Sequence, residues 1–425
     1  MISSSFTLPF SSIDPGFPAL QRTIETHRWK GRPTHRDVCR ISIDERRATE
    51  VNVYTNEFWT RRHRAANSLH QVSYRACFKP QLPRFFIELL THPGEFVYDP
   101  FMGRGTTPIE AAIMQRVPFG CDVNPLSIAL TAPRLSPPTL LQVRERLAAI
   151  DFSSADALPE HLLVFYHPET LREICALKSY LKQRAETQTF DPVDNWVRMV
   201  ALNRLTGHSQ GFFSVYTLPP NQAVSPEAQG RINEKRRQVP PRRGVPTLIL
   251  AKSESLLRDC DVSVRQALGS AVGAAKLMTS SSKSTPEIPS GSVALVVTSP
   301  PFLNTVDYAA DNWLRCWFCD IDATQLGITV VKRLDEWSTI MGEVFRELFR
   351  VVRSGGHVAF EVGEIRNGQL RLEEAVLPQA AAAGFEPVLV MINSQHFTKT
   401  ANCWGVRNNS KGTNTNRIVV LKRPA

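Results

Sequence analysis

Residues 95–122 read EFVYDPFMGRGTTPIEAAIMQRVPFGCD, and this stretch decides the fold. Its first apolar run, at 95–98, predicts a buried strand, which ends in a glycine-rich turn followed by a helix. A second apolar run, at 117–121, predicts another buried strand that is closed by Asp122. A strand, a glycine-rich turn, a helix and a strand with an acid about twenty residues on is the start of a doubly wound, nucleotide-binding sheet.

The turn itself has residues that suit a small anionic ligand. Gly103 and Gly105 let the backbone turn sharply and approach a ligand closely. Thr106 and Thr107 then place hydroxyls and main-chain amides at a helix start, where a carboxylate is stabilised. Asp122, at the end of the next strand, is placed to accept hydrogen bonds from a ribose diol. The turn therefore predicts a nucleotide-like cofactor.

A second motif, TSPPF at 298–302, follows the apolar run SVALVV. Two prolines at a strand end fix the backbone and leave carbonyls without competing local donors. The Ser299 hydroxyl and the Pro300 carbonyl can then accept hydrogen bonds from one amino group, with the Phe302 ring beside them to stack on a base. Methylation of an exocyclic amino group needs such acceptors, because they stabilise the positive charge that develops on nitrogen.

Length and composition fit a soluble chain with a polyanionic partner. The 425 residues suggest two domains or one domain with a large insertion, and 42% hydrophobic with 21% charged residues is ordinary for a chain with a buried core. Fifty Lys+Arg against forty Asp+Glu give a net charge of +10, which favours nucleic acid or an anionic surface. No segment reaches the roughly 18 apolar residues of a membrane helix, and no secretory signal begins the chain.

The eight cysteines are scattered, so a reducing, cytoplasmic location is expected. Cys316 and Cys319 form the one CxxC pair, with no second pair to complete a zinc site, so we predict two buried apolar residues and no metal.

Helical periodicity dominates after residue 135 and predicts helices, whereas the polar, basic and proline-bearing stretch that follows, with its core at 229–246, predicts a loop region. Strands resume at 292–299, 357–365, 387–393 and 417–423. The expected division of the chain is a basic, irregular N-terminal arm at 1–65, the first half of a sheet domain at 66–134, a helical and basic insertion at 135–284, and the second half of the sheet domain at 285–425. The arm mixes basic and aromatic residues, which fits a nucleic-acid contact and a solvated surface equally well.

Together, DPFMGRGTT and TSPPF resemble the cofactor and catalytic motifs of S-adenosylmethionine-dependent amino-methyltransferases of DNA, of the N4-cytosine/N6-adenine type. The stretch YRACFKPQL at 74–82 is similar to the segment that flanks the methionine end of the cofactor in this family. The resemblance covers about 70–135 and 285–365. It implies an α/β, Rossmann-like class I methyltransferase sheet interrupted by a mainly helical insertion, and S-adenosyl-L-methionine as the cofactor.

The resemblance also assigns roles to residues. The expected catalytic residues are Ser299, Pro300, Pro301 and Phe302. The expected cofactor-binding residues are Phe78, Lys79, Pro80, Asp99, Phe101, Gly103, Gly105, Thr106, Thr107, Asp122 and Asn124. The motif order resembles the branch of the family in which the target-recognition region lies between the motifs, so the expected DNA-binding residues are Arg231, Lys235, Arg236, Arg237, Arg242 and Arg243. The family often has an acid after its third strand, whereas this chain reads AAKLMTSSSK at 274–283.

In this family Ser-Pro-Pro-aromatic accompanies N4-cytosine methylation, so Ser299 implies a cytosine flipped out of double-stranded DNA. Methylation of cytosine carbon 5 is disfavoured, because no Pro-Cys dipeptide is present. N6-adenine methylation, methylation of tRNA, and an inactive nucleic-acid-binding relative remain as alternatives. A cognate restriction endonuclease acting as a separate protein is a partner that the family implies, whereas the recognition sequence and the oligomeric state are not encoded in any motif.

Overall fold

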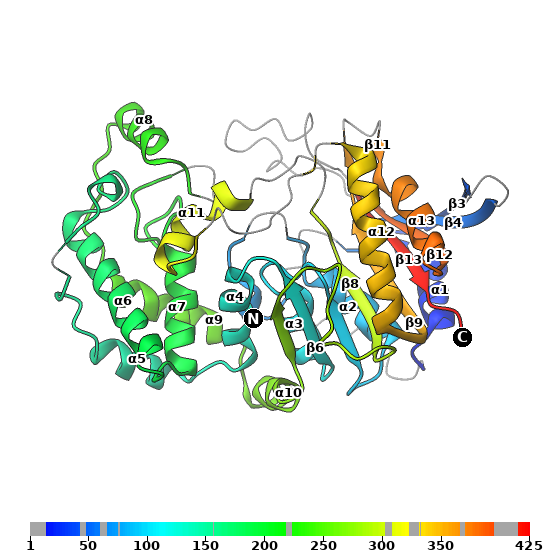
Figure 1. The fold of residues 1–425 in the computed structure, drawn as a ribbon, viewed down its shortest axis with the longest axis horizontal. Coiled ribbons are helices and arrows are strands. Elements are labelled where there is room, and N and C mark those ends of the chain that lie inside the picture. The colour runs from blue at the N-terminus through cyan, green and yellow to red at the C-terminus, as the bar shows by residue number, and fades with distance from the viewer. Residues whose placement is uncertain are drawn as a thin grey trace.

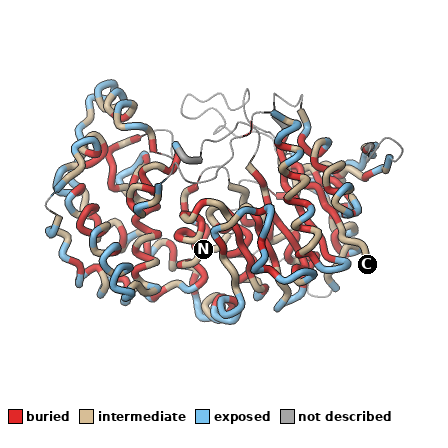
Figure 2. Tube along the Cα trace, in the orientation of Figure 1, coloured by how far each residue is buried: buried red, intermediate tan, exposed pale blue. Residues whose placement is uncertain are grey.

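The computed structural model describes residues 14–42, 48–59, 66–74, 77–155, 157–217, 223–301, 308–322, 331, 333–365, 370–394 and 415–425. A nine-stranded sheet forms one part of the molecule and a group of helices forms the other (Figure 1). Buried residues run through both parts (Figure 2). None of the helices in these ranges is both long and apolar enough to cross a lipid bilayer.

The sheet has the strand order β3-β4-β12-β13-β9-β8-β5-β6-β7. Strands β7, β6, β5, β8 and β9 are parallel to their neighbours in this run, and β13 is antiparallel to both β9 and β12. This mixed, mostly parallel sheet confirms the class I methyltransferase fold predicted from the sequence. The bounds are β3 His35–Ser42, β4 Ala48–Asn56, β5 Phe96–Asp99, β6 Val117–Asp122, β7 Lys276–Thr279, β8 Val293–Thr298, β9 Val352–Val362, β12 Glu386–Ser394 and β13 Thr415–Lys422.

Helices cover both faces of the sheet because its strands are apolar on both sides. One face packs against α12 (Leu334–Val351) and α13 (Leu372–Ala382), which carry the apolar stripe that includes Phe345, Leu348 and Leu377. The other face packs against α1 (Phe17–Thr26), α2 (Gln81–Leu90), α3 (Thr106–Ile113), α4 (Leu126–Leu135) and α10 (Val262–Val272). A short hairpin of β10 (Glu364–Ile365) and β11 (Leu370–Arg371) precedes α13.

The N-terminal stretch is not irregular where it is described, so that expectation was wrong. It forms α1, the two-residue strands β1 (Arg28–Trp29) and β2 (Arg32–Pro33), and the β3–β4 hairpin. Strand β4 pairs in parallel with β12 and extends the sheet. Its apolar alternation, with Val51 and Tyr54 buried, is the period-two signal that the many basic residues obscured.

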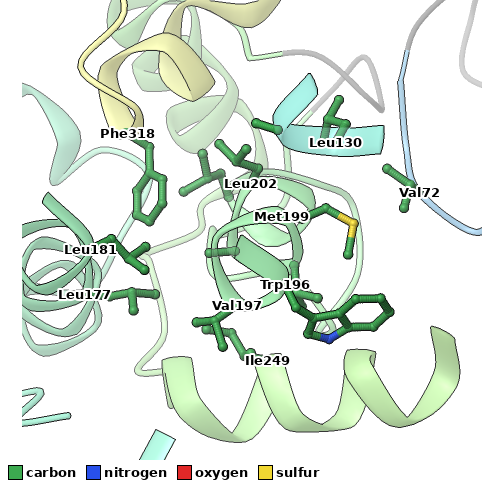
Figure 3. Close-up of a cluster of buried hydrophobic side chains, with 14 of the residues drawn as sticks. Val72, Leu130, Leu177, Leu181, Trp196, Val197, Met199, Leu202, Ile249 and Phe318 are labelled. Carbon is green, nitrogen blue, oxygen red and sulfur yellow. The ribbon is translucent and has the colours of Figure 1, made fainter. Parts of the chain in front are cut away.

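The helical part consists mainly of α5 (Leu140–Ala148), α6 (Pro168–Glu186), α7 (Pro192–Arg204), α8 (Pro226–Arg236) and α9 (Val245–Leu257), with single turns at η1 (Ser68–His70) and η2 (Glu160–Leu162). It shares one apolar cluster with α3 and α4, in which Trp196 and Met199 of α7 lie near Leu130 of α4 (Figure 3). Helix α8 falls in the stretch expected to be a loop. Ser225 caps it by accepting a hydrogen bond from the Ala228 amide at 3.2 Å, and Pro226 stands in its first turn.

The structure also shows which elements pack with which part. Helix α10 and strand β7, which lie in the range expected for the insertion, pack on or pair with the sheet. Helix α11 (Tyr308–Phe318), which lies in the range expected for the second half of the sheet domain, packs into the helical part through Leu314, Cys316 and Phe318. Cys316 is buried there, as expected, and Cys319 is partly buried at the end of the helix. The division into domains remains a prediction.

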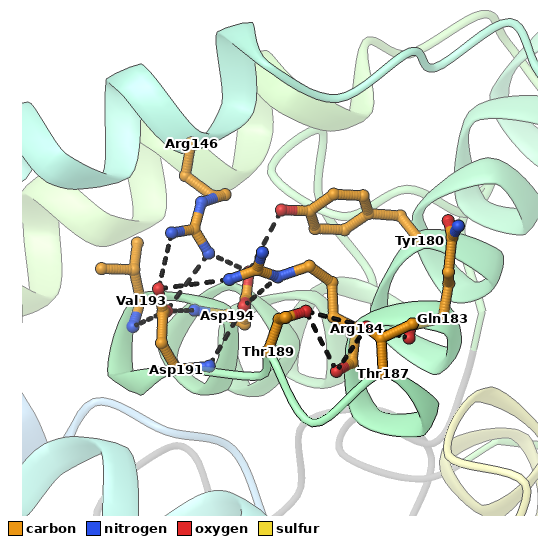
Figure 4. Close-up of polar contacts among 9 residues, drawn as sticks. All are labelled: Arg146, Tyr180, Gln183, Arg184, Thr187, Thr189, Asp191, Val193 and Asp194. Carbon is orange, nitrogen blue, oxygen red and sulfur yellow. Dashed lines mark hydrogen bonds and ion pairs between the residues drawn. The ribbon is translucent and has the colours of Figure 1, made fainter.

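A charge network around the buried Asp194 joins three helices of the helical part (Figure 4). Arg146 of α5 contacts both Asp191 (2.7 Å) and Asp194, and Arg184 of α6 contacts Asp194 at 2.8 Å. Asp191 also caps α7 by accepting from the Val193 amide at 2.8 Å. Burial alone would raise the pKa of Asp191, but the hydrogen bonds from Arg146 and from main-chain amides lower it to about 2. The network fixes the packing of α5, α6 and α7.

Candidate active site

The glycine-rich loop connects the carboxyl end of β5 to α3. Gly103 has φ +49° and Gly105 has φ +75°, and both values lie in the left-handed region that favours glycine. A Cβ at Gly105 would lie 2.2 Å from Thr131 Oγ1, so this position excludes larger residues by packing as well as by conformation. The main-chain amides at the start of α3 have no side-chain cap and therefore form an anion-favouring helix N-terminus.

Asp99 ends β5 inside the molecule. Its Oδ1 accepts hydrogen bonds from the Phe101 amide at 3.1 Å and from the Thr298 hydroxyl at 2.6 Å. Burial raises the pKa of Asp99 to about 7, although these two hydrogen bonds act in the opposite direction. Its Oδ2 is buried and has no hydrogen-bond partner among the described residues. An unpartnered buried carboxylate oxygen is an acceptor prepared for a cationic ligand group.

Asp122 ends β6 and orders the glycine loop. Its Oδ2 accepts from the Gly103 amide at 2.9 Å and its Oδ1 accepts from the Asn124 amide at 2.8 Å. Burial raises the pKa of Asp122, and these main-chain hydrogen bonds oppose that shift. Asn124 in turn accepts from the Leu126 amide at 3.0 Å at the start of α4, while its Nδ2 is buried without a partner in the described chain. Each oxygen of Asp122 keeps a further lone pair, so the carboxylate can still accept from a diol.

The predicted catalytic motif lies directly beside the glycine loop, although almost two hundred residues separate them in the chain. The Thr298 hydroxyl donates to Asp99, and the Thr107 hydroxyl donates to the Val297 carbonyl at 3.0 Å. Strands β5 and β8 are parallel neighbours, so their carboxyl ends meet at one edge of the sheet. This edge of a doubly wound sheet is where ligands bind.

The two predicted catalytic prolines are fixed by burial and by a hydrogen bond. Pro300 is buried, and the Pro301 carbonyl accepts from the Trp337 indole N–H of α12 at 2.9 Å. Ser299 is partly buried and donates a hydrogen bond to Glu361 of the neighbouring strand β9. Phe302, the predicted stacking ring, lies outside the described residues.

The predicted flanking segment approaches the loop from η1 and α2. Phe78 and Lys79 are partly buried, and Pro80 is buried at the start of α2. Tyr74 lies against Gly103, since a Cβ on that glycine would be 3.6 Å from the Tyr74 ring. The structure therefore brings the beginning of this segment to the loop.

Arg134 also supports the site, although it was not among the residues predicted from the sequence. Its guanidinium is fully buried and donates to the carbonyls of Leu130 (2.8 Å), Leu69 (3.1 Å) and Arg104. Arg104 in turn donates to the Val72 carbonyl at 2.7 Å. Burial lowers the pKa of Arg134 to about 9. The two arginines fasten the 69–72 segment to the glycine loop, and a basic residue in the last turn of a helix is too common to have indicated this.

The predicted DNA-binding arginines and lysine fall into two groups. Those on or just after α8 are exposed, namely Arg231, Lys235, Arg236 and Arg237. Arg242 is also exposed but pairs with Glu169 at 2.7 Å and Glu173 at 2.5 Å, and Arg243 donates to the Ser209 and Phe212 carbonyls. The structure thus gives the second group contacts within the helical part.

The described residues fit S-adenosyl-L-methionine, which presents an ammonium, a carboxylate, a ribose diol and an adenine ring. Asp99 Oδ2 suits the ammonium, the α3 N-terminus suits the carboxylate, and Asp122 suits the diol. Asn124 Nδ2 offers a donor beside them. Strand β7 ends at Thr279 and three serines follow, so no acid stands at the end of this strand.

Comparison with known proteins gives one family match. Residues 23–132 match the N6/N4 methylase family, described as DNA methylase. The match spans α1 to α4, including the glycine loop and Asp122, and it supports S-adenosyl-L-methionine as the cofactor. No curated protein matches the chain.

Several solved structures are similar to this chain. TrmN from Thermus thermophilus is 12% identical with a TM-score of 0.32, over 84% of this chain and 51% of that one. A putative DNA modification methylase from Thermus thermophilus, complexed with S-adenosyl-L-methionine, is 21% identical with a TM-score of 0.19, over 32% and 50%. An rRNA methylase from Streptococcus thermophilus is 8% identical with a TM-score of 0.30, over 82% and 99%. The chain spans about half the length of the first two, and TM-scores this low assign no function.

Proposed function

We propose that this protein is an S-adenosylmethionine-dependent methyltransferase that acts on an exocyclic amino group of a DNA base. The observation that carries the proposal is the junction of the two motifs, in which Thr298 bonds Asp99 and Thr107 bonds the Val297 carbonyl. This junction brings the loop predicted to bind the cofactor and the predicted amine acceptors, Ser299 and Pro300, to one sheet edge. The match of residues 23–132 to the DNA methylase family supports the same activity.

The chemistry assigns each motif a task. S-adenosyl-L-methionine supplies an activated methyl group. Asp99, Asp122 and the start of α3 would hold its ammonium, its ribose diol and its carboxylate at the sheet edge where β8 also ends. The Ser299 hydroxyl and the Pro300 carbonyl accept from the two N–H bonds of the target amine, which stabilises the charge that develops on nitrogen. Transfer is direct, with no covalent intermediate on the protein.

We further propose N4 of cytosine as the target. The support is Ser299 in the position that other family members give to aspartate or asparagine for adenine. Base flipping would deliver the target to this edge, because a paired base cannot reach the cofactor. N6-adenine and tRNA targets are separate outcomes of the test below.

Two basic surfaces support nucleic acid as the substrate. One is the exposed group on α8. The other is the β1–β2 hairpin with Arg28, Lys30 and Arg32, all exposed. Strand β4 runs parallel to β8 through β12, β13 and β9, so β3 begins at the carboxyl edge and the hairpin before it lies on the same edge as Ser299. Lys30 holds a φ of +48° at the tip, an uncommon conformation for this residue.

The test uses purified protein, tritiated S-adenosyl-L-methionine and unmethylated genomic DNA, with digestion to nucleosides and identification of the labelled one. Label in N4-methylcytosine is expected. Label in N6-methyladenine would refute the cytosine assignment, and label in tRNA alone would move the substrate to RNA.

Variants test the assigned roles. Ser299→Ala and Pro301→Ala should each abolish transfer while cofactor binding, measured by calorimetry, survives. Ser284→Ala, at an exposed serine in the loop before β8, is the matched control and should keep full activity. Near-normal transfer in both motif variants would show that these residues do not hold the amine.

A further inference from the structure

A chain of polar side chains leads away from Ser299 across the sheet. Ser299 donates to Glu361 of β9, and Asn416 of β13 donates to the same carboxylate. Asn393 of β12 donates to Asn416 Oδ1 at 3.4 Å and accepts from the Phe58 amide at 2.8 Å. This row of hydrogen-bonded side chains therefore extends from the end of β8 to the segment that follows β4.

Register explains why these residues meet. Ile418 of β13 pairs with Glu361, so Asn416, two residues earlier on the antiparallel strand, lies on the same face and nearer the carboxyl edge. Asn416 pairs directly with Asn393. On β8 and β9, Thr298 pairs with Phe360, which brings Ser299 level with Glu361. Four successive strands thus contribute to one row, and the row begins at the predicted catalytic serine.

Glu361 occupies an unusual position for a carboxylate. It is buried, and an isolated buried charge is costly. The groups that act on it from the packed elements are Asn416 and Ser299, which are both neutral, and no charged group of the described chain acts on it. Arg417, which neighbours Asn416, points to the other face and pairs with Glu373. Burial accordingly raises the pKa of Glu361 to about 7.

We propose that Glu361 positions Ser299 for amine methylation and is the final acceptor of the proton that the amine loses. This inference rests on the proposed function. Because Ser299 donates its hydroxyl proton to Glu361, its lone pairs are left to face the amine. Asn416 donates to the Glu361 carboxylate through Nδ2, and its Oδ1 accepts from Asn393. Because an asparagine can donate only through Nδ2, these two contacts fix the orientation of the Asn416 amide and so the position of the carboxylate.

Methyl transfer and the proton relay together conserve atoms and charge. The amine nitrogen attacks the methyl carbon, the new N–C bond forms, and the C–S bond breaks with its electron pair remaining on sulfur. The methylated amino group then carries a positive charge and passes a proton to Ser299 Oγ, while the hydroxyl proton of Ser299 moves to Glu361. Glu361 releases the proton to water before the next turnover.

The first measurement needs no activity. Infrared difference spectroscopy follows the protonated carboxyl band of the full-length protein against pH. We expect a band that titrates near pH 7, is absent in Glu361→Gln, and titrates at a higher pH in Ser299→Ala and in Asn416→Ala, because each of these loses a donor to the carboxylate. An unchanged midpoint in Ser299→Ala would overturn the link between the two residues, whatever the substrate is.

The second measurement is the single-turnover rate of methyl transfer at saturating cofactor between pH 5.5 and 8.5. The carboxylate is the active form, so the wild-type rate should rise with pH and level off above about 7. Glu361→Gln should lose this inflection and fall by about 10²–10⁴-fold, the usual contribution of a positioned proton acceptor. Its cofactor affinity should stay unchanged.

The controls separate the possible failures. Glu287→Gln, at an exposed glutamate before β8, should match wild type in rate and pH profile. A folded Glu361→Gln protein with the wild-type rate and inflection would overturn the relay. A wild-type protein that labels neither DNA nor tRNA would instead refute the proposed function, while the infrared shift in Ser299→Ala would still decide the contact.

Discussion

Gly105→Ala tests the glycine loop most sharply. The new Cβ would lie 2.2 Å from Thr131 Oγ1 and 2.4 Å from Thr131 Cγ2, and the residue would keep a φ of +75°. A left-handed conformation costs about 1–2 kcal/mol and overpacking a filled site costs about 1–3 kcal/mol, so the free energy of unfolding should fall by about 2–5 kcal/mol. Thr131 belongs to α4, so its displacement would also disturb the adjoining Asp122 turn.

Gly103→Ala is the matched control within the same loop. It also has a positive φ, of +49°, but its Cβ would lie 3.6 Å from the nearest atom, on the Tyr74 ring, which is an ordinary contact. Only the conformational term of about 1–2 kcal/mol applies there. Urea unfolding of the full-length protein, compared by midpoint at a common slope, measures both variants.

A double variant isolates the clash. Thr131→Ala removes the two nearest atoms, so Gly105→Ala should cost less in that background than in the wild-type protein, with a coupling within the usual range of about 0.5–3 kcal/mol for residues in contact. Equal destabilisation by Gly105→Ala and Gly103→Ala, with no coupling to Thr131, would refute the packing argument.

Three further outcomes can be measured. Because the pKa of Asp99 is about 7 and the cofactor ammonium requires the carboxylate, S-adenosyl-L-methionine affinity should weaken about tenfold per pH unit below pH 7 in calorimetry, and Asp99→Asn should bind weakly without that slope. Arg134→Met leaves buried carbonyls without donors, so urea unfolding should show a loss of about 2–4 kcal/mol. The exposed Arg144→Met control should change stability by at most about 0.5 kcal/mol. Lys235→Ala with Arg237→Ala should reduce the slope of log affinity for DNA against log salt by about 1 per lost phosphate contact, and an unchanged slope would remove α8 from the interface.

The local signals in the sequence predicted the centre of the fold correctly. The strand at 96–99, the turn, the helix at 106–113 and the strand at 117–122 follow one another within thirty residues, so nearby residues alone determine them. The later strands were equally clear because strands that are covered on both faces are continuous apolar runs. The N-terminal strands were not predicted, because the many basic residues of this stretch obscure the apolar alternation in ATEVNVYTN.

Parts of the site could not have been predicted from one sequence. Glu361, Asn393 and Asn416 lie on three strands, and each alone is an ordinary polar residue near a strand end. Only strand order and register bring them together. The same holds for Arg134, whose partners are main-chain carbonyls that carry no residue identity. Helix α8 was missed for a different reason, since its polar composition outweighed the capping serine and the proline that begin it.

The place where the helical part joins the sheet determines which part of the chain could be replaced. Arg265 of α10 donates to the Pro137 and Pro138 carbonyls at 2.6 and 3.0 Å, which ties the chain's exit from the sheet to its return. The roughly 120 residues between leave and re-enter at one point, between the strands β6 and β7. A segment of another length can therefore replace them without altering strand order, provided that it keeps the apolar contacts with Leu130 of α4 and with Leu314 and Phe318 of α11. Under the proposed function, such a replacement would change the basic surface on α8 and leave the glycine loop after β5 and the TSPP motif after β8 in place.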